Sequence, residues 1–131
     1  MLKPTNTDYL FKFSIVTAVY NVEAYLSEAI DSILSQDIGF IESIELILVD
    51  DGSTDASGAI CDEYQHKYPE NIVVIHKPNG GVASARNAGI AVARGRYVNF
   101  MDSDDKLTPD TLSSVYDFFI EHDKEVDLVS V

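Results

Sequence analysis

Short apolar runs alternate with segments of helical character along this chain, and this alternation constrains its fold more than any other feature. Four runs have the length and composition of buried strands: 13–19, 44–49, 72–75 and 97–101. The segments between them carry helical periodicity or helix start and stop signals. Strands that alternate with helices predict an α/β fold, with a mainly parallel sheet flanked by helices.

Length and composition indicate one domain. The chain has 131 residues and an apolar content of 46%, enough for one hydrophobic core and too apolar for a disordered chain. We expect a lead segment over 1–12 and a single domain over 13–131. The run 126–131 reads as a further strand in which the chain stops, so we expect this chain to be part of a longer protein.

The net charge and the cysteine content limit which classes of partner the chain can bind and which cellular compartment is expected. A net charge of -13 argues against a nucleic-acid partner, which would need a basic surface. Cys61 is the only cysteine, so no internal disulfide can form and a reducing compartment is expected. The sequence shows no signal peptide or membrane span. We therefore expect a cytoplasmic protein, and leave open a peripheral position at the inner face of the membrane.

Several polar residues and glycines carry the expected helix boundaries. Ser53 or Thr54 is predicted to cap the helix after the second strand, and Asn21 the helix after the first. Thr108 is predicted to cap the last helix, with Pro109 in its first position. Gly95 is predicted to stop the helix that begins near residue 82.

Two acidic clusters follow strand-like runs. Asp50 and Asp51 come after the second strand, and Asp102, Asp104 and Asp105 after the fourth. The carboxyl ends of parallel strands meet at one edge of the sheet, where open α/β folds bind ligands. Carboxylates crowded at a strand end repel one another unless a cation or hydrogen-bond donors offset the repulsion. The clusters predict a site for a divalent cation and a phosphorylated ligand; the alternative is a turn and a solvated acidic loop.

Two further segments reach the same edge. Residues 80–89 open a helix with small side chains and carry Arg86 one turn in, where it can either reach a phosphate or pair with an aspartate. Tyr20 follows the first strand, where it can stack on a base or simply pack.

Taken in order, these motifs resemble the N-terminal half of family 2 glycosyltransferases, which have the GT-A fold. The matching segments are 14–21 (SIVTAVYN), 32–36 (SILSQ), 49–55 (VDDGSTD), 80–89 (GGVASARNAG) and 95–105 (GRYVNFMDSDD). Ala18 departs from the pattern, since many members have proline there.

The resemblance implies a Rossmann-like nucleotide-binding domain that binds a UDP-sugar donor. Tyr20 and Asp51 would hold the uracil, Arg86 would lie near the diphosphate or the uracil edge, and Asp102 would contact the ribose. Asp104, with Asp102, would hold Mn²⁺ or Mg²⁺. The implied donor-binding residues are Ala18, Tyr20, Asp50, Asp51, Arg86, Asp102 and Ser103.

The implied reaction is an inverting, metal-dependent transfer of a hexose or N-acetylhexosamine to an acceptor hydroxyl on a saccharide or glycolipid, in polysaccharide or glycoconjugate synthesis. In the family the general base is a carboxylate of the C-terminal half, so this chain alone is expected to bind donor without catalysing transfer. A receiver-type phosphoacceptor domain with an acidic Mg²⁺ pocket is the main alternative. A haloacid-dehalogenase-type phosphatase ranks below it, because Lys106 stands where that class carries Thr or Val. A sugar-nucleotide-binding module without activity is a third alternative.

Overall fold

The computed structural model describes residues 9–122 and 128–130, which form an α/β fold around a parallel sheet. The five strands lie in the order β3-β2-β1-β4-β5. The elements, in chain order, are β1 (Phe11–Val19), α1 (Leu26–Leu34), α2 (Phe40–Ser43), β2 (Ile44–Asp51), α3 (Ser57–Lys67), β3 (Ile72–Lys77), α4 (Val82–Val92), β4 (Gly95–Phe100), α5 (Thr111–Glu121) and β5 (Leu128–Ser130). The predicted fold class is confirmed, whereas most of the expected lead segment lies outside the described residues.

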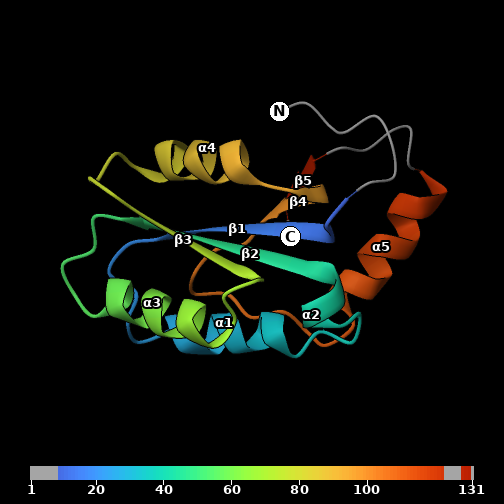
Figure 1. The fold of residues 1–131 in the computed structure, drawn as a ribbon, viewed down its shortest axis with the longest axis horizontal. Coiled ribbons are helices and arrows are strands. Elements are labelled where there is room, and N and C mark those ends of the chain that lie inside the picture. The colour runs from blue at the N-terminus through green and yellow to red at the C-terminus, as the bar shows by residue number, and fades with distance from the viewer. Residues whose placement is uncertain (1–8, 123–127, 131) are drawn as a thin grey trace.

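Helices cover both faces of the sheet, so the central strands are apolar on both sides. Figure 1 shows α4 on one face and α1, α2 and α3 on the other. Every residue of β2 is buried. Val16, Ile47 and Val98 pack under α4, and Ile15, Leu46 and Leu48 pack on the opposite side. Among the described residues, no helix has the length and apolar character that crossing a membrane requires.

The predicted helix starts are wrong in detail. The second strand extends through Asp51, and α3 begins only at Ser57, so neither Ser53 nor Thr54 caps it. Helix α5 begins at Thr111, beyond Thr108 and Pro109. In each case the polar residues organise a loop before the helix, because short hydroxyl and carboxylate side chains also bond to backbone outside helices.

Two other local predictions also need correction. Gly95 does not stop α4 but begins β4, where a Cβ would lie 2.5 Å from the backbone N of Ser14, so its small size serves a close approach of two strands. The apolar spacing of 112, 115, 119 and 120 predicts an inner stripe on α5; Leu112 and Phe119 are buried accordingly, but Ile120 is 47% exposed. Tyr116 takes its place against the core, because the inner face follows the spacing 112, 115, 116 and 119.

The amino ends of the strands are joined by a buried carboxylate. Glu45 in β2 is fully buried and accepts hydrogen bonds from the Ser14 hydroxyl (2.8 Å), the Arg94 backbone N–H (2.8 Å) and Arg94 Nε (2.6 Å). The Ser14 hydroxyl oxygen in turn accepts the N–H of Gly95. This network links β1, β2 and β4 at the edge opposite the acidic clusters.

Candidate functional site

A cleft of about 340 Å³ lies at the carboxyl ends of β1, β2 and β4. Parallel strands bring their ends to one edge, so segments distant in sequence meet there. The cleft is lined by Ala18, Tyr20, Val22, Asp51, Val82, Arg86, Met101, Asp102, Ser103 and Asp104. All residues predicted to bind donor or metal lie in this lining except Asp50.

Asp51 is the last residue of β2 and is held by donors from the end of β3 and from the turn that follows it. Its Oδ1 accepts hydrogen bonds from Lys77 Nζ and the Gly80 N–H, each at 2.9 Å. Its Oδ2 accepts the Gly81 N–H at 2.9 Å and a longer contact from Asn79 Nδ2 at 3.4 Å. The Lys77 bond, with those from Gly80 and Gly81, lowers the pKa of Asp51 despite its burial. The carboxylate is therefore an anionic acceptor with a fixed orientation.

Asp102 and Asp104 form the acidic side of the cleft, and Asp105 lies beside them. Each offers a carboxylate oxygen, and these oxygens lie within 4.8 Å of one another on exposed side chains. The Asp105 N–H bonds to the Asp102 carbonyl at 3.1 Å, which closes the turn that gathers the three side chains. Hard divalent cations take oxygen ligands at such spacing and keep open positions for phosphates. The donor set fits Mn²⁺ or Mg²⁺, with Asp105 as a third oxygen donor beside the two predicted.

Arg86 brings a positive charge to this acidic cleft. Its Nη2 lies 3.7 Å from Asp102 Oδ1, and its guanidinium carbon lies 5.0 Å from the centre of the Phe100 ring. The pairing with an aspartate, one of the two expected alternatives, is thus present. Because both partners are substantially exposed, the ion pair is weak and a phosphate can compete for the guanidinium.

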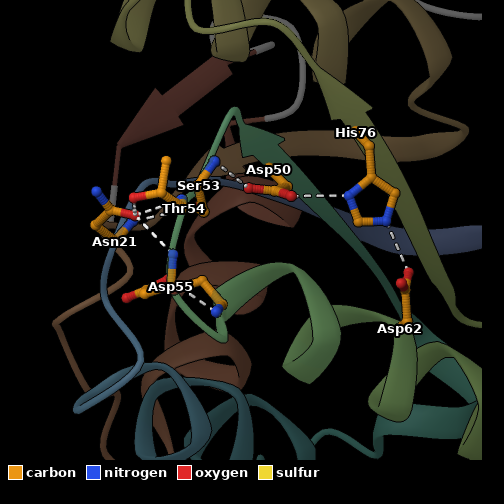
Figure 2. Close-up of polar contacts among 8 residues, drawn as sticks. Asn21, Asp50, Ser53, Thr54, Asp55, Asp62 and His76 are labelled. Atoms are coloured by element: carbon orange, nitrogen blue, oxygen red, sulfur yellow. Dashed lines mark hydrogen bonds and ion pairs between the residues drawn. The ribbon is translucent and has the colours of Figure 1, made fainter.

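Asp50 faces away from the cleft, although it was predicted to bind donor. Its Oδ2 lies 2.8 Å from His76 Nδ1 on β3, and its Oδ1 accepts the Ser53 N–H at 3.0 Å (Figure 2). Burial alone would raise the pKa of Asp50, but the bonds from His76 and Ser53 outweigh it and lower the pKa. Adjacent residues of a strand point to opposite faces, so only Asp51 of this pair can reach the cleft.

The structure also adds residues that the sequence interpretation missed. Neither His76 nor Lys77 was given a role in the site from the sequence. Their register provides the signal: His76 pairs with Asp50 and Lys77 with Asp51 across neighbouring parallel strands. Asn21 was expected to cap α1; instead its Oδ1 accepts the N–H groups of Thr54 (2.8 Å) and Asp55 (3.3 Å).

Known proteins are similar to this chain in both sequence and fold. GgaB, a minor teichoic acid biosynthesis protein of Bacillus subtilis strain 168, is 53% identical over 121 residues, which are 92% of this chain and 13% of GgaB. TarS of Staphylococcus aureus Mu50, a poly(ribitol-phosphate) beta-N-acetylglucosaminyltransferase, is 34% identical over 122 residues, or 93% of this chain and 21% of TarS. This chain therefore spans only a small part of these curated relatives.

Solved structures have a similar fold. The crystal structure of S. aureus TarS residues 1–349 in complex with UDP superposes with a TM-score of 0.77 at 35% identity, covering 86% of this chain and 33% of that one. The expected GT-A architecture is confirmed by this match. The model of the family described as "Glycosyl transferase family 2" matches residues 14–131. A match of that extent establishes that the chain belongs to glycosyltransferase family 2.

Proposed function

We propose that this chain is the donor-binding part of an inverting glycosyltransferase that transfers a sugar from a UDP-sugar to an acceptor hydroxyl. The observation that carries the proposal is the cleft itself, which gathers an aromatic ring, an anionic acceptor, a guanidinium group and a carboxylate cluster. Structures of TarS in complex with UDP and with UDP-GlcNAc support a uridine nucleotide as the ligand.

Tyr20 and Asp51 form the proposed nucleobase end. Tyr20 is 48% exposed in the cleft, which leaves the ring available for stacking on a base. Asp51 is held as an anion, so it can accept a hydrogen bond from a base N–H such as the uracil imide. The longer Asn79 contact on Oδ2 leaves capacity there for another donor.

Asp104 and Asp102 form the proposed cation end, with Asp105 near them. Mn²⁺ or Mg²⁺, when bound, would stabilise as a Lewis acid the negative charge that develops on the departing diphosphate. Arg86 adds a fixed positive charge on the same side of the cleft, where it would contact the phosphates. Ala18 and Ser103 also line the cleft, and Asp102 would contact the ribose in the proposed pose.

Attack by an acceptor hydroxyl requires a general base. We place this base and most of the acceptor site outside these 131 residues, so this chain by itself binds donor without transferring sugar. The teichoic acid proteins among its relatives support a saccharide or glycolipid acceptor in cell-surface polysaccharide synthesis. We place the reaction in the cytoplasm, at the inner face of the membrane when a glycolipid is the acceptor.

The receiver-domain alternative does not hold. The chain belongs to a glycosyltransferase family, and Asp50, which would join the acidic pocket of a receiver, is turned toward His76. The phosphatase alternative fails on the same family match.

Thermal unfolding with UDP, GDP and ADP, each with and without Mn²⁺, tests the proposal. A ligand at about one hundred times its Kd stabilises by about 2.7 kcal/mol, which is several degrees for a domain of this size. We expect the largest rise with UDP plus Mn²⁺, its loss in Asp104→Ala, and its retention in Asp117→Ala, which removes an exposed carboxylate on α5. Equal rises with all three nucleotides, or none with UDP, would contradict the proposal.

A further inference from the structure

The corner between β1 and α1, which carries Tyr20, is held by side chains from the connection between β2 and α3 and from the first residue of α3. The backbone N–H groups of Asn21, Val22 and Glu23 donate to Ser53 Oγ (3.1 Å), Ser57 Oγ (2.9 Å) and Asp55 Oδ2 (3.2 Å). Three successive donors of one segment thus find their partners in a single other segment. Backbone groups left unpaired are costly, so the shape of the corner depends on this connection.

The side chain of Asn21 adds bonds in the opposite direction, from the backbone of the connection to the corner. Its φ of 50° is in the left-handed region, which asparagine tolerates better than most residues. In this conformation its Oδ1 reaches the N–H groups of Thr54 and Asp55. The residue next to Tyr20 is therefore fixed to residues 53–55 in both directions.

The connection is anchored at its start by Asp50 and His76. Asp50 Oδ1 accepts the Ser53 N–H at 3.0 Å, and its Oδ2 bonds to His76 Nδ1 at 2.8 Å. His76 Nε2 lies 2.8 Å from Asp62 Oδ1 on α3, so the ring joins β2 to α3 on either side of the connection (Figure 2).

The two bonds of His76 define its charge state. A carboxylate can only accept, so both ring nitrogens must donate, and only the imidazolium form does so. The bonds from Asp50 and Asp62 raise the pKa of His76 despite some desolvation. The Cys61 thiol of α3 also interacts with Asp50 and Asp62; burial raises its pKa to about 12, so it stays neutral.

We propose that His76 is a positioning residue for the nucleotide cleft. His76 fixes the side chain of Asp50, and Asp50 fixes the β2–α3 connection. That connection fixes Asn21 and thereby the side of the cleft that Tyr20 forms, the Tyr20 wall. The inference rests on the proposed donor site for its functional consequence, and it gives Asp50 a role other than direct ligand contact. The side chain of His76 is 49% exposed, so its replacement leaves the core intact.

The test compares His76→Gln with His66→Gln, which changes an exposed histidine on α3 outside this network. Glutamine keeps one hydrogen-bond donor but carries no charge and cannot bridge both carboxylates. Asp62→Asn is the third variant; with it, the ring still donates from Nδ1 to Asp50. The measurements are amide hydrogen exchange at residues 21–23 and 53–55, and calorimetric UDP affinity with Mn²⁺ from pH 6 to pH 9.

In His76→Gln we expect faster exchange at both segments and UDP affinity lower on the order of fivefold. Affinity of the wild type falls as pH rises through the raised pKa of His76, because one ring nitrogen then stops donating. The pH-dependent fall in UDP affinity is absent in His76→Gln and retained in His66→Gln. Asp62→Asn loses less UDP affinity than His76→Gln does. A purely stabilising role would lower the unfolding midpoint and leave the pH dependence of binding unchanged.

The inference is overturned if His76→Gln shows the same amide exchange and the same UDP affinity as His66→Gln. It is also overturned if UDP affinity in His76→Gln falls with pH as it does in the wild type. The two proposals fail separately. If the wild type does not bind UDP, the proposed function fails, while exchange at 21–23 and 53–55 still decides whether His76 fixes this corner.

Discussion

Asp51 illustrates at the residue scale how one side chain can serve both the fold and the site. Its carboxylate accepts from a lysine and from two backbone N–H groups of the turn after β3, and it also faces the cleft. A neutral amide in its place would present its own N–H groups to donors or leave them unpaired. The residue is therefore sensitive both to mutation and to protonation.

Asp51→Asn should lower the free energy of unfolding at neutral pH by about 1–3 kcal/mol, because the amide has one acceptor oxygen where the carboxylate has two and loses the charge-assisted bond from Lys77. The pKa of Asp51 is lowered in the folded state, so its stabilisation is present above the unfolded value near 3.8 and is lost as pH falls through the folded pKa. Urea unfolding from about pH 5 to about pH 2 should show a shallower acid loss in the variant than in the wild type. Asp117→Asn on α5 is the control; an identical acid loss in Asp51→Asn and wild type would contradict the prediction.

A cleft residue could be predicted from the sequence where it directly follows a recognisable strand, because the site lies at the strand ends. Asp51, Asp102 and Asp104 were assigned correctly to one edge because each follows an apolar run. Asp50 was misplaced because the strand extends through both aspartates, and alternation along the strand then sends the first one to the opposite face. His76 and Lys77 were missed because their partners depend on the register between β2 and β3, which no local pattern reveals.

At the scale of elements, the close approach of α4 to the sheet depends on a glycine. A Cβ on Gly89 would collide with Val16 Cγ1 and lie 3.2 Å from Val16 Cγ2 on β1. This contact sets how near Arg86, one turn earlier on α4, comes to the strand ends. The small residues of this helix thus serve packing, which explains part of the 80–89 motif without invoking a ligand.

Gly89→Ala should destabilise the chain, because overpacking costs about 1–3 kcal/mol while helix propensity returns at most about 1 kcal/mol. In a Val16→Ala background the colliding methyl groups are absent, and the same substitution should be neutral or stabilising. Urea unfolding of the four chains in this double-mutant cycle measures the coupling. Equal effects of Gly89→Ala in both backgrounds would show that α4 does not rest on Val16.

Element existence was predicted better than element boundaries. All four helices and five strands expected from the pattern are present, because burial on one or two faces imposes a period on the sequence. The starts of α3 and α5 were placed too early, since Ser53, Thr54 and Thr108 bond within loops instead of capping. The short helix α2 was not predicted, because four residues are too few to show a period.

For the molecule as a whole, the net charge of -13 produces a field that opposes both compaction and the approach of an anionic ligand. Raising NaCl from about 0.02 M to about 0.5 M should raise the unfolding midpoint, because the Debye length shortens from roughly 20 Å to a few ångströms. Scanning calorimetry at fixed pH measures the shift. A midpoint that falls with salt would mean that local ion pairs such as Lys77–Asp51 outweigh the general repulsion.

The attachment of the β1–α1 corner to the β2–α3 connection has a consequence for the order of events during synthesis. Asn21 leaves the ribosome long before Ser53 and Thr54, the residues that it bonds, and His76 follows later still. A nascent chain that ends before His76 carries Tyr20 on a corner whose anchor is incomplete. The wall of the cleft nearest the N-terminus therefore reaches its final shape only once the third strand has joined the sheet, although its own residues are made first.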